Sequence, residues 1–274
     1  MTEKIKVDLG SIQKTMFLPL FARAAETLKA APVLGDTTAV DIVNSIDYDF
    51  SLIQGKVQNL SHAAMVMRSL YIDGTIKKFL QKHPKAVVVN IGCGMDTTFE
   101  RVDNGLLRWF DLDLPDTMEL RRKFLKESRR RVFITSSFLE PSWLDMLKPT
   151  DNILFISAGV FRYFEEKQVQ DFINLIAARF PGGELVFDAS SPGGIKAANR
   201  GVMKDSGLDN KASLMKWGLV AGDAQKVLGE KVKILEIDTF QKNSGLKFSL
   251  FEKTMIAVNS ALCLNYMVHV KFVR

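Results

Sequence analysis

The sequence predicts a doubly wound α/β domain preceded by a helical N-terminal lid. Short β-branched runs alternate with helical patterns from residue 86 onward, which is typical of a parallel sheet with right-handed crossovers. The first of these runs leads at once into Gly92 and Gly94, and residues 11–83 show helical spacing with almost no strand signal. Together these observations favour one compact domain, residues 84–274, with an N-terminal extension, residues 1–83.

Composition places the chain among ordinary globular proteins. The 274 residues are 47% hydrophobic and 25% charged, which suits a soluble protein with a sizeable core. The net charge of +6 would tolerate an acidic partner, but the basic residues are dispersed, so we expect no nucleic-acid partner. The longest apolar stretch, 255–267, is interrupted by three polar residues and is too short for a membrane span.

The cysteines and the N-terminus indicate a cytoplasmic location. Cys93 and Cys263 provide no disulfide framework and no metal-ligand spacing, so we expect no metal. Glu3, Lys4 and other charges in the first ten residues exclude the apolar core of a secretory signal.

The N-terminal helices are predicted from apolar spacing. Pro32 and Gly35 break the pattern, and Asp36 is placed to cap the next helix. One core face is expected to hold Leu20, Ala24, Thr27 and Leu28, and a second Met65, Met67, Leu70, Ile76, Phe79 and Leu80.

The strands are predicted from short apolar runs, and the helices between them from 3.6-residue spacing. The runs cover residues 86–91, 107–112, 132–135, 152–157, 184–189, 231–237 and 266–272. The clearest helix covers 165–180, with Phe172, Leu175, Ile176 and Phe180 on one face and Pro181-Gly182-Gly183 at its end. Another helix is expected from about 248 to 261.

A basic run from Arg121 to Arg131 has two interpretations. It is either an anion-binding patch or the solvated face of a helix before the third strand, and we favour the solvated face.

The segment 87–97, VVVNIGCGMDT, is the most informative in the chain. Glycines after a buried strand let the backbone turn sharply and let a ligand lie against main chain. Dinucleotide-binding dehydrogenases share such glycines, but their third glycine is replaced here by Thr97. A nicotinamide-dependent oxidoreductase is therefore the less favoured alternative.

Acidic residues follow the second strand in RWFDLDLPD, residues 108–116. A carboxylate about 20 residues after such glycines accepts hydrogen bonds from ribose hydroxyls in nucleotide-binding folds. Asp111 and Asp113 are both candidates; we prefer Asp113, with Pro115 starting the next helix. The alternative is a set of loop and helix-cap carboxylates.

These motifs together resemble the family of leucine carboxyl methyltransferases and polyketide-synthesis O-methyltransferases. The resemblance runs from about residue 14 to the last strand. It is carried by TMFLPLFARAAET (15–27), DYDFS (47–51), RSLYIDGTIKKFL (68–80), NIGCGMDTTFER (90–101), WFDLDLP (109–115) and AGVFRYFEE (158–166). It implies a seven-stranded sheet with the last strand antiparallel, and S-adenosylmethionine bound across the carboxyl ends of the strands.

The resemblance also implies a cofactor site. Arg68 matches the arginine that pairs with the methionine carboxylate, which a guanidinium binds with two parallel hydrogen bonds. Gly92, Cys93 and Gly94 would lie against the cofactor and Asp113 would hold its ribose, with Ser137 and Phe138 in the adenine region. The chain departs from the family in two places: Ser137 replaces a common Asp, and Ala158-Gly159 replaces a common Glu-Gly pair.

The resemblance implies an O-methyltransferase that acts on a carboxylate or phenolic oxygen of a small, polyketide-like acceptor, acidic or aromatic. A carboxylate is already ionised at pH 7, whereas a phenol benefits from a general base. His62 is the candidate base, and Tyr163 is placed either to line the acceptor pocket or to pack in the core. Arg23 would orient an acidic acceptor or brace the lid through Asp47 or Asp49. A non-catalytic cofactor-binding protein stays the second alternative, and the oligomeric state stays open.

Overall fold

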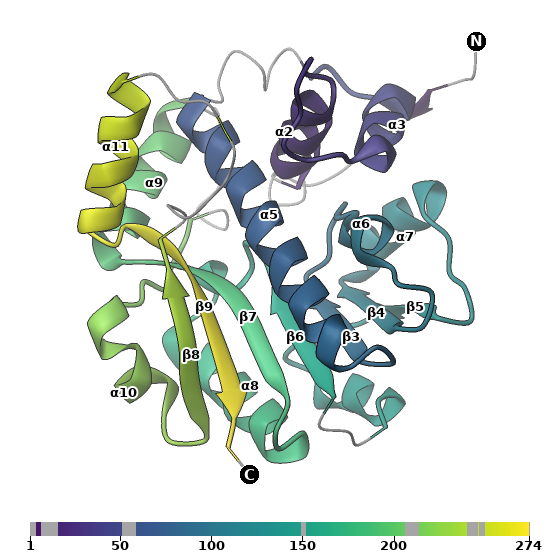
Figure 1. The fold of residues 1–274 in the computed structure, drawn as a ribbon, viewed down its shortest axis with the longest axis vertical. Coiled ribbons are helices and arrows are strands. Elements are labelled where there is room, and N and C mark those ends of the chain that lie inside the picture. The colour runs from purple at the N-terminus through teal and green to yellow at the C-terminus, as the bar shows by residue number, and fades with distance from the viewer. Residues whose placement is uncertain are drawn as a thin grey trace.

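The computed structural model describes residues 4–6, 16–50, 59–148, 152–205, 214–239, 246 and 250–273. Its centre is a seven-stranded sheet in the order β5-β4-β3-β6-β7-β9-β8 (Figure 1). The strands are β3 (Val87–Ile91), β4 (Arg108–Asp113), β5 (Arg131–Thr135), β6 (Ile153–Ser157), β7 (Glu184–Ser190), β8 (Val232–Asp238) and β9 (Asn265–Phe272). All seven predicted strands are confirmed to within one residue at each end.

The strand order defines where a ligand binds in such a sheet. β3 pairs in parallel with β4 on one side and with β6 on the other, while β9 is antiparallel to both β7 and β8. The prediction of a mostly parallel sheet with the last strand antiparallel is therefore confirmed. Because the chain reverses its direction of winding at β3, the crevice outside the carboxyl ends of β3 and its neighbours is the expected ligand site.

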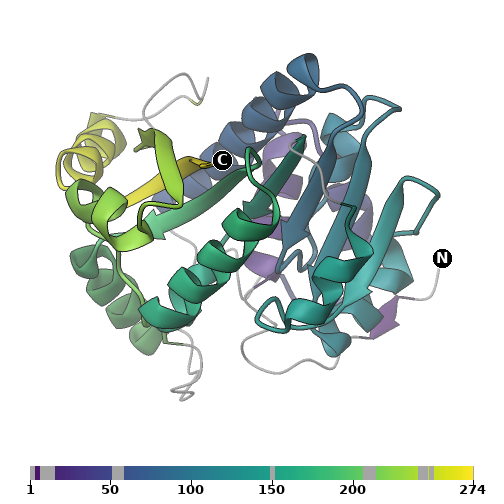
Figure 2. The ribbon, with the colours of Figure 1, turned by 90° about the horizontal axis from the view of Figure 1, so that it is seen from below.

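Helices cover both faces of the sheet (Figure 2). α5 (Asn59–Lys82) lies on one face with α6 (Thr98–Val102), and α8 (Glu166–Arg179) packs on the other with the 3₁₀ turns η1 (Pro141–Met146) and η2 (Phe161–Tyr163). The remaining helical elements are α7 (Pro115–Phe124), α9 (Pro192–Asp205), η4 (Ala221–Asp223), α10 (Ala224–Leu228) and α11 (Leu250–Ala261). No described helix combines the length and apolarity needed to cross a membrane.

The predicted helices at 165–180 and 248–261 are confirmed as α8 and α11. Phe172, Ile176 and Phe180 are buried as expected, but Leu175 is 38% exposed, so its assignment to the core is wrong. Its position lies at the margin of the apolar face, where the helix surface turns toward solvent.

The N-terminal region forms helices α2 (Phe17–Thr27) and α3 (Thr37–Ser45). Asp36 caps α3 as predicted, because its Oδ1 accepts a hydrogen bond from the Ala39 N–H at 2.9 Å. Leu20 is fully buried, but Leu28 follows the last turn of α2 and is 71% exposed, so its predicted core role is wrong. A short parallel pair, β1 (Ile5–Lys6) with β2 (Ile46–Asp47), was not predicted, since two residues carry no periodicity.

An aromatic cluster joins this region to the sheet. Phe17 lies 5.1 Å from Tyr48, and Phe21 stacks on Phe50 at 5.5 Å between ring centroids. The same apolar cluster includes Cys93 and side chains of α7. Helices α2 and α3 therefore pack against the segment that follows β3, beyond the carboxyl ends of the central strands (Figure 1).

Candidate active site

The glycine turn after β3 is held against the neighbouring strand. The N–H groups of Gly92 and Cys93 both donate to the Leu112 carbonyl, at 2.8 and 3.1 Å. Gly92 has φ +62° and Gly94 φ +48°, a region that side chains disfavour. A Cβ on Gly92 would lie 2.4 Å from Cγ2 of Val160, so only glycine fits this turn.

Asp113 ends β4 beside that turn. Its Oδ2 accepts from the Gly94 N–H at 2.7 Å, and its Oδ1 accepts from the Leu114 N–H at 2.8 Å. Burial raises the pKa of Asp113, while the two N–H donors oppose the rise. Each carboxylate oxygen keeps a second lone pair, and the side chain is partly exposed. Asp113 can therefore accept further hydrogen bonds from a ligand that lies over the glycine turn.

Asp111 does not face that crevice, which corrects its assignment as a cofactor residue. The residue is 0% exposed and accepts from the Trp109 indole N–H at 2.8 Å and from Nε of Arg131 at 2.8 Å. The guanidinium of Arg121 lies 2.9 Å away. These partners surround the carboxylate, so Asp111 is an internal counter-ion.

The favoured interpretation of the basic run as a solvated face is correct for the exposed Arg122, Lys123, Lys126 and Arg129, but it is wrong for the two ends of the run, Arg121 and Arg131. Both are buried, at 0% and 2% exposure, so neither a solvated face nor an open anion-binding patch describes them. Arg121 Nη1 also donates to the Gly94 carbonyl at 2.7 Å. Through this bond the buried Arg121–Asp111 pair holds the glycine turn in position from the protein interior.

Cys93 points away from the crevice. It is 3% exposed, its Sγ lies 3.8 Å from Sδ of Met118, and burial raises the pKa of its thiol. Only the main chain of Cys93 is therefore available to a ligand.

Arg68 lies near the carboxyl end of β6. Its Nη1 binds Oδ2 of Asp188 at 3.0 Å and lies 3.0 Å from the position that a Cβ on Gly159 would take. Gly159 has φ +76° and donates its N–H to Oδ1 of Asp188 at 2.5 Å. Arg162 also binds Oδ2 of Asp188 through Nη2. Although burial acts in the opposite direction, the two guanidinium groups lower the pKa of Asp188.

The other residues assigned to the cofactor lie after β5 and β6. Ser137 Oγ accepts from the Leu139 N–H at 3.2 Å and so shapes the turn after β5. The Phe138 ring packs in the core against Phe164, 4.6 Å away, so its side chain does not line an open site. Ala158 packs beside the α5 face of the core.

The two candidate catalytic residues lie on different elements. His62 is near the start of α5, and its buried Nε2 has no hydrogen-bond partner among the described residues. Burial lowers the pKa of His62, and the nearby Lys29 adds to the effect. Tyr163 lies in η2, where its N–H donates to the Val160 carbonyl at 3.1 Å.

A buried ionic network was missed by the sequence analysis. Asp36 Oδ2 accepts from Arg23 Nε at 2.9 Å, Arg101 Nη1 at 2.6 Å and Thr97 Oγ1 at 2.6 Å. Arg101 also binds both oxygens of Asp73, at 2.7 and 2.9 Å. Asp73 of the 68–80 motif thus pairs with Arg101, and Arg68 pairs with Asp188.

This network connects α2 and the cap of α3 to the glycine turn. Arg23 donates from Nη2 to the Met95 carbonyl at 3.0 Å and lies 3.9 Å from Asp96. Although burial opposes it, the positive charges of Arg23 and Arg101 lower the pKa of Asp96 to about 2. Arg23 was expected to pair with Asp47 or Asp49 if it braced the N-terminal region, and that pairing is wrong, because its carboxylate partner at hydrogen-bond distance is Asp36.

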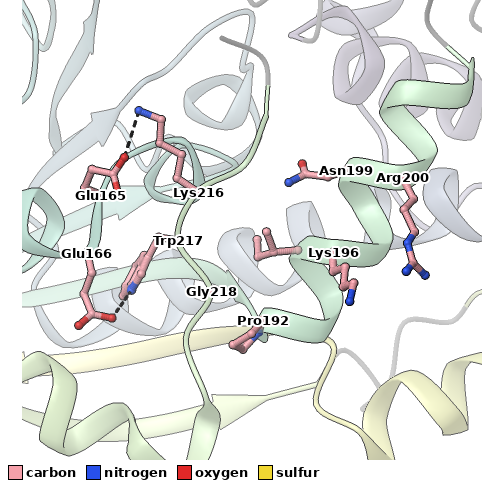
Figure 3. A pocket seen from close by; sticks show the side chains of 10 residues that line it. Glu165, Glu166, Pro192, Lys196, Asn199, Arg200, Lys216, Trp217 and Gly218 are labelled. Carbon is pink, nitrogen blue, oxygen red and sulfur yellow. Dashed lines mark hydrogen bonds and ion pairs between the residues drawn. The ribbon is translucent and has the colours of Figure 1, made fainter. Parts of the chain in front are cut away.

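An open cavity of about 580 Å³ lies between α9 and the segment 216–218, near the start of α8 (Figure 3). Trp217 donates its indole N–H to Glu166 at 3.1 Å, and Lys216 pairs with Glu165 at 3.3 Å. The main-chain N–H groups of Lys216 and Trp217 donate to the Arg162 carbonyl, at 2.7 and 3.1 Å. One wall of the cavity is therefore anchored to the same turn that carries Arg162.

Comparisons with known proteins agree with this arrangement. The model of the leucine carboxyl methyltransferase family matches residues 17–177. The tetracenomycin polyketide synthesis O-methyltransferase TcmP of Streptomyces glaucescens is 31% identical over 187 residues, 68% of each chain. The S-adenosyl-L-methionine-dependent methyltransferase dpfgK of Gibberella zeae is 29% identical over 212 residues, 70% of each chain.

The solved structures support the fold. Magnesium protoporphyrin IX methyltransferase from Synechocystis PCC 6803, a structure with bound S-adenosylhomocysteine, aligns with a TM-score of 0.50 and 12% identity, covering 86% of this chain and 100% of that one. This likeness and the strand order identify a class I methyltransferase fold. With the family model and the two relatives, it establishes that the chain belongs to the leucine carboxyl methyltransferase family and is an S-adenosylmethionine-dependent methyltransferase.

Proposed function

We propose that the protein transfers a methyl group to a carboxylate or phenolic oxygen of a small-molecule acceptor. The observation that carries the proposal is the Gly94–Asp113 hydrogen bond, which joins the turn after β3 to the tip of β4 at the point where the sheet reverses its winding. O-methylation is supported by the similarity to TcmP, whose name places it in polyketide synthesis.

The residues at this sheet edge fit S-adenosylmethionine. Asp113 offers free lone pairs to the ribose hydroxyls, and Gly92 and Gly94 present main chain without side chains. Arg68 lies beyond them, over Gly159, where it would bind the methionine carboxylate. A guanidinium has five N–H donors, and the bond from Arg68 Nη1 to Asp188 uses one of them, so Arg68 can also bind that carboxylate. The main chain at Ser137 and Phe138 would border the adenine.

When bound, the cofactor supplies a methyl group activated by a sulfonium. The protein's task is to align an acceptor oxygen with that methyl group and to exclude water. We assign water exclusion to residues 1–83 as a lid, with 84–274 as the cofactor-binding domain. The aromatic cluster of Phe17, Phe21, Tyr48 and Phe50 and the buried Asp36 network support this assignment, because they fix α2 and α3 against the glycine turn.

The need for a base depends on the acceptor. A carboxylate reacts as the anion and needs no base, whereas a phenol needs a proton acceptor. His62 is suited to that role, because its lowered pKa favours the neutral imidazole at pH 7 and its Nε2 has no partner in the part of the chain that the structure describes. Tyr163 is assigned to the lining of the acceptor site, on the turn that also carries Arg162.

Methyl transfer from labelled S-adenosylmethionine to panels of aromatic acids and phenols tests the proposal. Mild base distinguishes the products, because it releases labelled methanol from a methyl ester and leaves a methyl ether intact. We expect label in one of these two forms with the wild type and at least a tenfold lower rate with Asp113→Ala at subsaturating cofactor. Label found only on nitrogen, carbon or sulfur acceptors, or in none, would refute O-methylation.

A further inference from the structure

The Arg162 guanidinium is incompletely satisfied. Its Nη2 binds Asp188, and among the residues that the structure describes its Nη1 contacts the Met215 sulfur at 4.0 Å, while its buried Nε has no hydrogen-bond partner there. The side chain is 15% exposed. Leaving a buried donor without an acceptor is unfavourable, so such a donor needs an explanation, and a ligand oxygen is one.

The position of Arg162 favours the acceptor over the cofactor as that ligand. Its main-chain carbonyl holds Lys216 and Trp217, which line the cavity beside α9 (Figure 3). Its guanidinium forms an ion pair with Asp188, which also pairs with Arg68 of α5. Arg162 thus lies between the residue assigned to the methionine carboxylate and the wall of an open cavity.

The net charge of the cluster also favours an anionic acceptor. Two guanidinium groups share one carboxylate, so the cluster is positive before any ligand binds. A methionine carboxylate would compensate one of them, but the same cofactor brings a sulfonium and an ammonium. An anionic acceptor would reduce the remaining excess in a site where water screens charges poorly.

Accordingly, we propose that Arg162 is the residue that selects an anionic acceptor, by binding an anionic oxygen group through Nε and Nη1 while Asp188 fixes its position. This inference rests on the proposed function and narrows its acceptor to a molecule that carries a negative charge at the Arg162 end. A guanidinium suits this role because its planar donors bind two oxygens side by side.

The test is probe binding to the protein saturated with S-adenosylhomocysteine, measured by calorimetry with 2-naphthoate and the uncharged 2-naphthamide. We expect the wild type to prefer the carboxylate by at least tenfold. Arg162→Met should abolish the preference and leave the Kd for S-adenosylhomocysteine within twofold. Arg162→Lys keeps a charge beside Asp188 but loses the planar fork, so it should retain the fold and lose most of the preference. Arg179→Met, at a partly exposed arginine on α8 that pairs with Asp145, is the matched control.

Three results would overturn the proposal. In the first, the wild type shows no preference for the carboxylate or binds neither probe. In the second, Arg162→Met retains the preference. In the third, Arg162→Met weakens the binding of S-adenosylhomocysteine as much as that of 2-naphthoate. The last result would place Arg162 in the cofactor site. Because the readout is binding, it is independent of whether methyl transfer to oxygen is detected.

Discussion

Removal of the Asp36 carboxylate should strongly destabilise the packing of helices α2 and α3. The side chain is 0% exposed and accepts hydrogen bonds from Arg23, Arg101, Thr97 and the Ala39 N–H. Asp36→Ala leaves two buried guanidinium groups without this partner, and breaking such a buried pair costs about 3–5 kcal/mol. Arg101 retains both bonds to Asp73, so we expect a loss near 3 kcal/mol in the free energy of unfolding.

Urea denaturation of the two proteins measures this loss. The control is Asp171→Ala on α8, where the exposed pair with Lys167 should contribute less than about 0.5 kcal/mol. Because Arg23 also holds the Met95 carbonyl, we further expect Asp36→Ala to weaken S-adenosylhomocysteine binding about tenfold, equivalent to ~1.4 kcal/mol. A loss in unfolding free energy no larger than that of Asp171→Ala would refute the role of the network.

Three further predictions follow from single residues. Gly92→Ala should lower the free energy of unfolding by about 2–4 kcal/mol, because φ is +62° and the new Cβ would contact Val160. Adding Val160→Ala should recover only the part of this loss that comes from the contact. Equal stability of Gly92→Ala and the wild type would contradict this. Asp96 has a folded pKa of about 2 against 3.8, so its contribution is complete above pH 4 and is lost as the pH falls toward 2. The stability difference between wild type and Asp96→Asn should thus shrink by about 1 kcal/mol between pH 5 and pH 3, and a constant difference would argue against the shift. His62→Gln should keep the rate of methyl transfer to a carboxylate within threefold, whereas a hundredfold loss would identify His62 as a general base.

The sheet could be predicted because its signals are local. Each strand contains a short apolar run, and the helix 165–180 shows 3.6-residue spacing before Pro181. The Asp36 cap could be predicted for the same reason, since a cap depends on neighbours three residues away. These features do not need knowledge of the tertiary fold.

The ion pairs could not be predicted because they depend on distant segments. Arg68 and Asp188 are 120 residues apart, and Arg101 and Asp36 are 65 apart. Asp111 and Asp113 occupy alternate positions of one strand and so point to the same face of the sheet. They differ in burial. Asp113 is the last residue of the strand and is partly exposed, whereas Asp111 is buried between Arg121 and Arg131.

The central claim is that the glycine turn after β3 and Asp113 at the tip of β4 form the adenosyl site. Titration calorimetry with S-adenosylhomocysteine on the wild type, Asp113→Ala and Asp171→Ala tests it most directly. We predict that Asp113→Ala binds at least tenfold more weakly, within the ~1–3 kcal/mol expected for a lost partner of a buried group, while Asp171→Ala binds as the wild type does. An affinity of Asp113→Ala equal to that of the wild type, in a protein that unfolds at the same urea concentration, would contradict the account.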